Sequence, residues 1–299
     1  AVGLDGGYKS FNGICLTDTF QLGETDNADD LFTDMLPQNS ARVIEQKKAP
    51  VRIIIGNPPY SVGQKSANDN AQNQKYPLLD AKIADTYVKH SNATNPNKIY
   101  DSYIKAFRWS SDRIIDKDGG IIAFITNGIW LDNTSFDGFR KCLEDEYDSI
   151  YVFNLRGGIK GKSGDNAKRE GQNVFDIMTG VAITILVKNP KHHQEKASIY
   201  YHDIGEYLKR SEKLGILNSF KDISNSKIDW KVLKPNEHND WLNQRSDLFS
   251  SFIQMEPDKK FNLSSKSVFS LNSLGINTNR DVWVYNFSKD NLKTNTKNL

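Results

Sequence analysis

Ile53-Ile54-Ile55-Gly56-Asn57-Pro58-Pro59-Tyr60 is the stretch from which we interpret this sequence. The apolar run at 51–55 predicts a buried parallel strand, because it is rich in β-branched residues, does not alternate with polar ones and ends at a glycine. The two prolines that follow fix φ and remove two backbone donors, so that neither a strand nor a helix continues. The sequence therefore predicts a rigid turn at the carboxyl end of a strand, where open α/β sheets bind ligands.

The chemistry of this turn suits an exocyclic amine on a planar ring. The amide oxygen of Asn57 and the main-chain carbonyl of Pro58 are two acceptors held in place before any reaction. The ring of Tyr60 offers a stacking surface, worth roughly 1–3 kcal/mol per base in single-strand binders. The alternative is a Pro-Pro turn that simply ends a strand, since Asn-Pro is a common turn starter.

The overall composition is that of an ordinary globular protein. The 299 residues allow one large domain, or one domain with part of another, and the net charge of +2 requires any surface for a polyanion to be local. The two cysteines, Cys15 and Cys142, have no metal-ligand or redox spacing, so we predict no metal site and a cytoplasmic location. The sequence has no apolar run of about 20 residues, and we predict no membrane partner.

Apolar runs alternate with helical patterns along the chain. Strands are predicted at 121–126, 149–154, 179–187 and 197–201, and helices at 40–48, 99–115 and 204–217. This alternation predicts an α/β fold with a parallel sheet covered by helices on both faces. We expect the strand at 197–201 to pair with the one before it as a closing hairpin.

Two polar segments are candidates for nucleic-acid contact. The glycine-rich segment at 156–173 is the more basic, and its cations suit phosphate contact unless it is only a mobile, solvated loop; our candidates are Lys160, Lys162, Lys168 and Arg169. The long polar segment at 61–98 either closes over a base and follows the DNA backbone, or is a solvated insertion.

The tetrapeptide Asn57-Pro58-Pro59-Tyr60, placed after an apolar strand, resembles motif IV of the amino-methyltransferases that use S-adenosylmethionine (SAM). The resemblance implies a Rossmann-like class I methyltransferase sheet, SAM as cofactor and these four residues as the catalytic ones. Asp18 resembles the motif III acid that lies beside the SAM adenine, although it could equally cap the next turn. Phe175 precedes a run similar to motif VIII, where a ring packs against a flipped base; alternatively it is a core residue.

The segment Gly275–Phe287 is similar to part of the single-chain (type ISP) restriction-modification enzymes. This resemblance implies a methyltransferase core at 1–201, a helical connector at 202–260 and the start of a mixed α+β target-recognition region at 261–299. It also implies double-stranded DNA as partner, and nuclease and helicase domains in the same polypeptide.

The SAM glycine loop and ribose acid of that fold have no counterpart in the sequence, because no strand precedes Gly3, Gly6 and Gly7 and no apolar helix follows them. We therefore expect a fold truncated on its N-terminal side, which by itself binds SAM weakly and is inactive.

Three functions follow from these patterns. The first is methylation of adenine N6 in DNA, on a base that has left the duplex. The second keeps the motif but changes the acceptor to an RNA guanine or a protein glutamine. The third is a non-catalytic DNA-binding fragment, which the absent glycine loop suggests.

Overall fold

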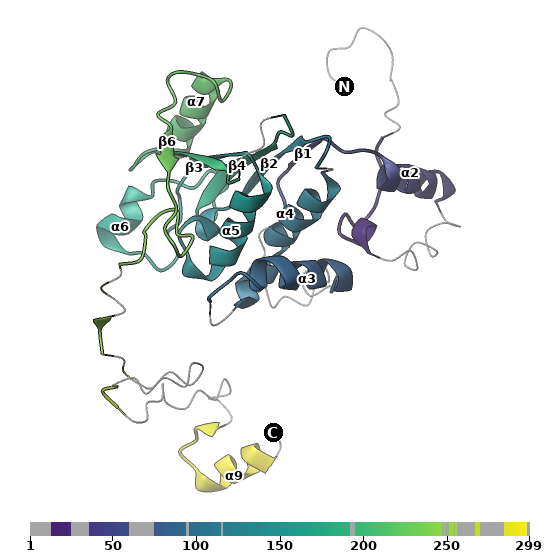
Figure 1. Cartoon of the computed structure of the whole chain (residues 1–299). Coiled ribbons are helices and arrows are strands. Elements are labelled where there is room, and N and C mark those ends of the chain that lie inside the picture. The colour runs from purple at the N-terminus through teal and green to yellow at the C-terminus, as the bar shows by residue number, and fades with distance from the viewer. Residues whose placement is uncertain are drawn as a thin grey trace. The chain divides into compact units, whose positions relative to one another are not determined.

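The computed structural model describes residues 13–24, 36–59, 75–93, 96–114, 116–191, 195–246, 248, 251–253, 255, 267–269 and 284–297. The chain divides into two compact units, Ala1–Gln244 and Arg245–Leu299. The first unit contains the sheet and the helices that cover it (Figure 1). In the second unit the described residues include helix α9 (Lys289–Lys297).

A six-stranded mixed sheet forms the centre of the first unit, with the strand order β1-β2-β4-β3-β5-β6. Its strands are β1 (Ile53–Gly56), β2 (Gly120–Asn127), β3 (Ser149–Asn154), β4 (Val181–Lys188), β5 (Ser198–Asp203) and β6 (Lys231–Leu233). β1 is parallel to β2 and β3 is parallel to β5, whereas β4 is antiparallel to both β2 and β3. β6 pairs antiparallel with β5.

The prediction of a parallel sheet is therefore wrong for β4. A parallel connection needs a crossover that packs on the sheet, usually an apolar helix. Between β3 and β4 the chain offers only α6 (Gly164–Arg169), which has no buried residue. The basic segment instead connects the carboxyl end of β3 to the start of β4 on the same side of the sheet, so that β4 runs in the opposite direction.

The predicted hairpin between β4 and β5 is also wrong. β5 pairs with β3, with Ile199 opposite Ile150. β4 cannot pair with β5, because both of its sides are already paired: Ile183 lies between Ile125 of β2 and Phe153 of β3.

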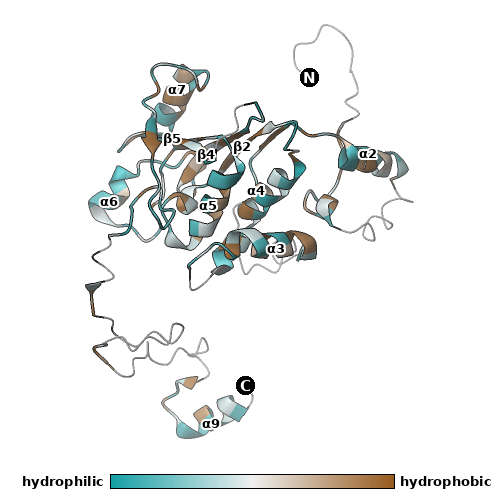
Figure 2. Cartoon of the chain, viewed as in Figure 1, coloured by the Kyte–Doolittle hydropathy of each residue, from teal (hydrophilic) through white to brown (hydrophobic). Residues whose placement is uncertain are grey.

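Helices cover the sheet on both faces (Figure 1). One core joins the sheet to α3 (Pro77–Ile83), α4 (Ser102–Arg113) and α5 (Asp137–Glu146). A second core contains Phe220 at the end of α7 (Arg210–Phe220). Successive residues of β3 belong to different cores, Val152 to the first and Phe153 to the second, so the cores lie on opposite faces. Figure 2 shows the apolar residues gathered along the strands.

Part of the segment predicted as a long polar loop is a helix that packs into the first core. α3 continues into a π-helical turn, Ala84–Val88, and Leu79, Ile83 and Tyr87 are all buried. These residues recur every four positions and form one face of the helix. They lie in the two short runs, 76–80 and 83–87, for which the sequence indicates some ordered structure within the polar segment. Residues 60–74 lie outside the described part of the chain.

β1 forms one edge of the described sheet, and the prediction that it is buried is wrong. Ile53 and Ile55 are 63% and 78% exposed, while Ile54, on the other side of the strand, packs against the first core. Its four paired residues face a single neighbour, β2. Helix α2 (Pro37–Lys48) precedes β1 and agrees with the helix predicted at 40–48.

The chain beyond β5 also belongs to the first unit. Trp241 is buried, packs edge-on against Trp130 with ring centroids 5.4 Å apart, and donates to Glu144 Oε1 at 2.7 Å. The compact unit thus extends to Gln244. The functional division at residues 201 and 260 stays a prediction, and it does not coincide with this boundary.

No helix in the described part of the chain combines the length and apolar character needed to cross a membrane.

Trp241→Phe should destabilise the first unit. The variant removes the indole N–H from Glu144, whose carboxylate is buried and whose pKa is raised by that burial. We expect the free energy of unfolding to fall by about 1–3 kcal/mol, as measured by urea unfolding of the purified protein. Val232→Thr, at an exposed position of β6, is the control and should leave it unchanged; equal stability of Trp241→Phe would show that the 230–244 segment does not hold the core together.

Candidate active site

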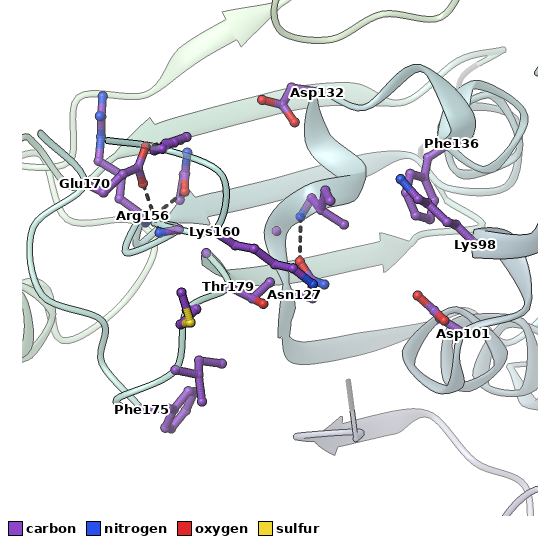
Figure 3. Close-up of a pocket in the computed structure, with 18 of the residues that line it drawn as sticks. Lys98, Asp101, Asn127, Asp132, Phe136, Arg156, Lys160, Glu170, Phe175 and Thr179 are labelled. Atoms are coloured by element: carbon purple, nitrogen blue, oxygen red, sulfur yellow. Dashed lines mark hydrogen bonds and ion pairs between the residues drawn. The ribbon is translucent and has the colours of Figure 1, made fainter. Parts of the chain in front are cut away.

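A cavity of about 910 Å³ lies at the edge of the sheet where β1, β2 and β3 end (Figure 3). Its lining includes Asn57 after β1, Asn127 at the end of β2, Asn154 at the end of β3 and Gly180 just before β4. Because β4 is antiparallel to its neighbours, its beginning lies beside their carboxyl ends. The four strands therefore contribute to one site.

Three of the four motif residues lie on this cavity. Asn57 and Pro59 are exposed and Pro58 is half-buried, and all three belong to its lining. Asn57 thus lies beside an open space and not inside the packed interior. Tyr60 lies outside the described residues, so its stacking role stays a prediction.

Phe175 lies on the same cavity, 41% exposed, and Figure 3 shows it on the loop that leads to Thr179. Asn173, which is buried, fixes this loop. Its amide nitrogen donates to the carbonyl oxygens of Thr179 at 2.7 Å and Gly157 at 3.2 Å, and its Oδ1 accepts from the Phe175 N–H at 2.8 Å. The sequence analysis missed Asn173, because an asparagine in a polar loop has no pattern that marks it as buried.

The four basic candidates fall into two groups. Lys160 and Lys162 line the cavity, whereas Lys168 and Arg169 lie on α6 and do not. Lys162 is paired with Glu170 at 2.5 Å, and Arg169 lies 3.2 Å from Asp165. Among the residues that the structure describes, Lys160 and Lys168 have no acidic partner within ion-pair distance.

Both ends of the basic loop are held by a buried lysine that the sequence analysis did not identify. Lys213 of α7 donates from Nζ to the carbonyl oxygens of Leu155 at 2.8 Å and Glu170 at 2.9 Å. Burial lowers the pKa of this amine. The Glu170 carboxylate in turn accepts from the Gly158 N–H at 3.1 Å. The loop base is thus fixed, and its basic residues extend from a rigid frame.

Asp18 does not line the cavity. Its Oδ1 accepts from the Phe20 N–H at 3.0 Å, which is the turn-capping alternative, and its Oδ2 accepts from the Tyr76 hydroxyl at 2.7 Å. Burial, reinforced by Asp18, raises the pKa of Tyr76. A role of Asp18 beside a cofactor stays a prediction. The described residues provide neither a glycine-rich turn between a strand and a helix nor a ribose acid, and by themselves they do not fit a SAM site.

Two further carboxylates line the cavity. Burial raises the pKa of Asp101 to about 6, an effect that Lys98 partly offsets. Burial also raises the pKa of Asp132, against the opposing effects of Lys162 and Arg140. In Figure 3, Asp101 lies at the side of Lys98 and Phe136, and Asp132 lies on the loop that follows β2. The cavity therefore combines amide and carbonyl acceptors, an aromatic ring and charges of both signs.

Comparison with known proteins identifies a methylase domain in this chain. Residues 12–158 match the family described as Eco57I restriction-modification methylase, and residues 267–299 match the Type ISP C-terminal specificity domain. The search of curated proteins gave no significant match.

Solved structures give closer matches. The chain is similar to the ATP-dependent Type ISP restriction-modification enzyme LlaBIII bound to DNA, with 42% identity over 99% of this chain and a TM-score of 0.86. For a nuclease-deletion mutant of the Type ISP enzyme LlaGI in complex with a DNA substrate mimic, the identity is 42% over 98% of this chain and the TM-score is 0.83. For a DrdV–DNA complex, the identity is 35% over 97% of this chain and the TM-score is 0.79.

These matches identify a restriction-modification methylase domain in this chain. The chain is similar over 99% and 98% of its length to two Type ISP restriction-modification enzymes, and it carries the methylase domain followed by sequence of the Type ISP C-terminal specificity domain. It spans 19%, 23% and 28% of the lengths of the three solved chains.

Asp101→Asn should change how stability depends on pH. The pKa of Asp101 is about 6 in the folded protein, above its ordinary value of 3.8, so its contribution is favourable at low pH and is lost as the pH rises through about 6. We expect the free energy of unfolding of the variant, relative to wild type, to increase by about 1–3 kcal/mol between about pH 4 and pH 8.

Urea unfolding across this pH range measures the effect. Lys98→Met provides the opposite perturbation, because it removes the charge that lowers the pKa of Asp101. The free energy of unfolding of this variant should therefore fall more between about pH 4 and pH 8 than that of wild type. A pH-independent difference between Asp101→Asn and wild type would show that the pKa of Asp101 is the same in the folded and unfolded protein.

Proposed function

We propose that this chain is the part of a DNA adenine-N6 methyltransferase that binds and orients an extruded adenine. The observation that carries the proposal is the position of Asn57 and Pro58 at the rim of a cavity that also contains Phe175. In this proposal the sheet is the later part of a Rossmann-like class I methyltransferase sheet. SAM supplies the methyl group, and the SAM-binding residues lie mainly outside those that the structure describes.

The chemistry of the acceptor determines what the residues do. The lone pair of an adenine amine is delocalised into the ring, and the amine becomes nucleophilic as its nitrogen approaches tetrahedral geometry. The Asn57 side-chain oxygen and the Pro58 carbonyl oxygen accept its two hydrogens and favour that geometry. No strong base is needed before attack, because the nitrogen loses its proton to solvent or to an acceptor afterwards.

Extrusion of the base costs a few kcal/mol, which stacking and pocket hydrogen bonds offset. Phe175 supplies one ring on the described side of the cavity, and in our proposal Tyr60 supplies another. The loop that carries Phe175 is held by Asn173. A fixed ring loses little conformational freedom on binding, which favours stacking.

DNA is the proposed partner, supported by the similar structures, in which LlaBIII is bound to DNA and LlaGI is in complex with a DNA substrate mimic. Nuclease and helicase domains in the same polypeptide are proposed as well: LlaBIII is described as ATP-dependent, and the LlaGI structure is of a nuclease-deletion mutant.

Asn57→Ala in the intact enzyme should abolish methylation, because the variant removes one of the two acceptors for the amine. We expect at least a hundred-fold loss, on the order of that for a single lost oxyanion donor, measured as incorporation of labelled methyl groups into duplex DNA. Asn218→Ala, at an exposed position of α7 away from the cavity lining, is the matched control and should keep wild-type activity. Methylation at the wild-type rate by Asn57→Ala would contradict the mechanism.

The same assay tests the acceptor. We expect N6-methyladenine in DNA, and incorporation into RNA or protein in preference to DNA would favour the corresponding alternative acceptor.

Loop lysines with and without an acidic partner should differ in DNA binding. Lys160→Ala and Lys168→Ala should each reduce the slope of log K against log salt by about one, as expected for the loss of a phosphate contact. Lys162→Ala is the matched control in the same loop and should change the slope less, because Glu170 already neutralises Lys162. Equal effects of all three would show that the ion pair opens on DNA.

A further inference from the structure

The segment Gly128–Phe136, which we name the cavity wall, follows β2 and contributes Gly128, Ile129, Asp132 and Phe136 to the cavity lining. It consists of two short 3₁₀ turns, Gly128–Leu131 and Thr134–Phe136. The side chains of Asn127 and Asn133 cap these turns. Asp132 lies between the two turns and is therefore positioned by whatever fixes the residues on either side of it.

Arg140 of α5 fixes both sides. Its side chain is fully buried, and Nη1 donates to the carbonyl oxygens of Trp130 at 2.7 Å and Asn133 at 2.9 Å. A buried guanidinium is stabilised only when its donors are paired. The carbonyl oxygens of Trp130 and Asn133 thus accept hydrogen bonds from the guanidinium. The guanidinium in turn fixes the distance between these two residues, which lie on either side of Asp132.

The same guanidinium binds a second segment, about 100 residues further along the chain. Its Nε donates to the Asn239 carbonyl oxygen at 2.6 Å, and Nη2 pairs with Asp240 at 3.2 Å. We name Asn236–Gln244 the connector turn. Its geometry is fixed internally, because the Asn236 side chain accepts from the Asp240 N–H at 2.9 Å and Asn239 has a left-handed φ of 56°.

The connector turn also contacts the cavity directly. Asn243 donates from Nδ2 to Asp132 Oδ2 at 3.3 Å, and this hydrogen bond lowers the pKa of Asp132 against the effect of burial. The first compact unit ends one residue later, at Gln244. The chain continues into the unit whose residues 267–299 match the specificity domain. The connector turn is thus the last segment of the first unit before that domain.

We propose that Arg140 and Asn243 are positioning residues that transmit target recognition to the base cavity. When the specificity domain binds its target sequence, the connector turn that precedes it in the chain shifts. The hydrogen bonds of Arg140 and Asn243 then move the cavity wall and Asp132 with the turn. This inference rests on the proposed function of the cavity. Loss of the link should lower the methylation rate on the cognate sequence without weakening DNA binding.

Asn243→Asp in the intact enzyme is the sharpest test, because it places a second carboxylate against Asp132. We expect kcat on cognate DNA to fall about ten-fold, with the Kd for DNA within about two-fold of wild type, and the kcat ratio between cognate and single-mismatch DNA to shrink. The double variant Asp132→Asn/Asn243→Asp restores one donor and one acceptor and should recover most of the rate. Asn218→Ala is the control that leaves both parameters unchanged.

Two outcomes would overturn the proposal: an unchanged kcat ratio in Asn243→Asp, or no recovery in the double variant. Arg140→Lys keeps the charge but cannot bind both segments with the same geometry, and it should show the same loss of kcat; if its melting temperature falls, the exposed Asn243 variants decide the question alone.

An activity-independent measurement separates this proposal from the proposed function. Amide hydrogen exchange of peptides covering 128–136 should slow when cognate DNA replaces non-cognate DNA, in Asn57→Ala as in wild type, and this difference should disappear in Asn243→Asp. Equal exchange on both DNAs would reject the link whether or not the chain methylates adenine. A preserved difference together with no methylation by wild type would reject the proposed function and leave the link supported.

Discussion

Strand β4 runs antiparallel between β2 and β3, and this pairing places the loop that carries Phe175 on the cavity. Backbone hydrogen bonds on both sides fix its register, and the inserted strand reverses the direction of the chain. As a result the loop carrying Phe175 meets the carboxyl ends of β1, β2 and β3. If β4 lay beyond β3 instead of between β2 and β3, the loop carrying Phe175 would lie farther from Asn57 by one more strand spacing, about 5 Å.

Three buried polar side chains hold the loops around the cavity. Lys213 binds both ends of the basic loop, Asn173 fixes the turn before Phe175, and Arg140 joins the cavity wall to the connector turn. Each donates to at least two main-chain carbonyl oxygens of these loops, and such bonds from a buried donor favour one loop conformation. Burial of polar groups is costly unless they are paired, which makes the partners of these residues as important as the residues themselves.

The charged side chains around the cavity also differ in whether they are held by a partner. Within the basic loop, Lys162 and Arg169 lie in ion pairs with neighbouring acids, whereas Lys160 and Lys168 do not among the described residues. In the cavity, burial raises the pKa values of Asp101 and Asp132. A base bound in the cavity would thus meet two kinds of group. The charge of the carboxyl groups depends on their burial, whereas the amide and main-chain carbonyl oxygens are neutral acceptors at any pH.

Local sequence patterns located much of the fold. The strand bounds at 149–154 and the helix at 40–48 could be predicted because β-branched runs and helical spacing are local properties. The end of β1 could be placed because two prolines lack the N–H that a strand requires. The connection between β3 and β4 could not, because a strand covered on both faces is apolar throughout whether its neighbours are parallel or, as for β4, antiparallel.

The sequence by itself determined the rigid turn at Asn57–Pro59, its place after a strand and the chemical type of the acceptors it presents. Only the tertiary structure decided that β1 lies at an edge with Ile53 and Ile55 exposed, that Asp18 accepts from the Tyr76 hydroxyl, and that Lys213 and Arg140 are buried. The physical reason is that burial and ion pairing depend on segments about 40 to 100 residues apart in the chain, and no local pattern records which of those segments meet.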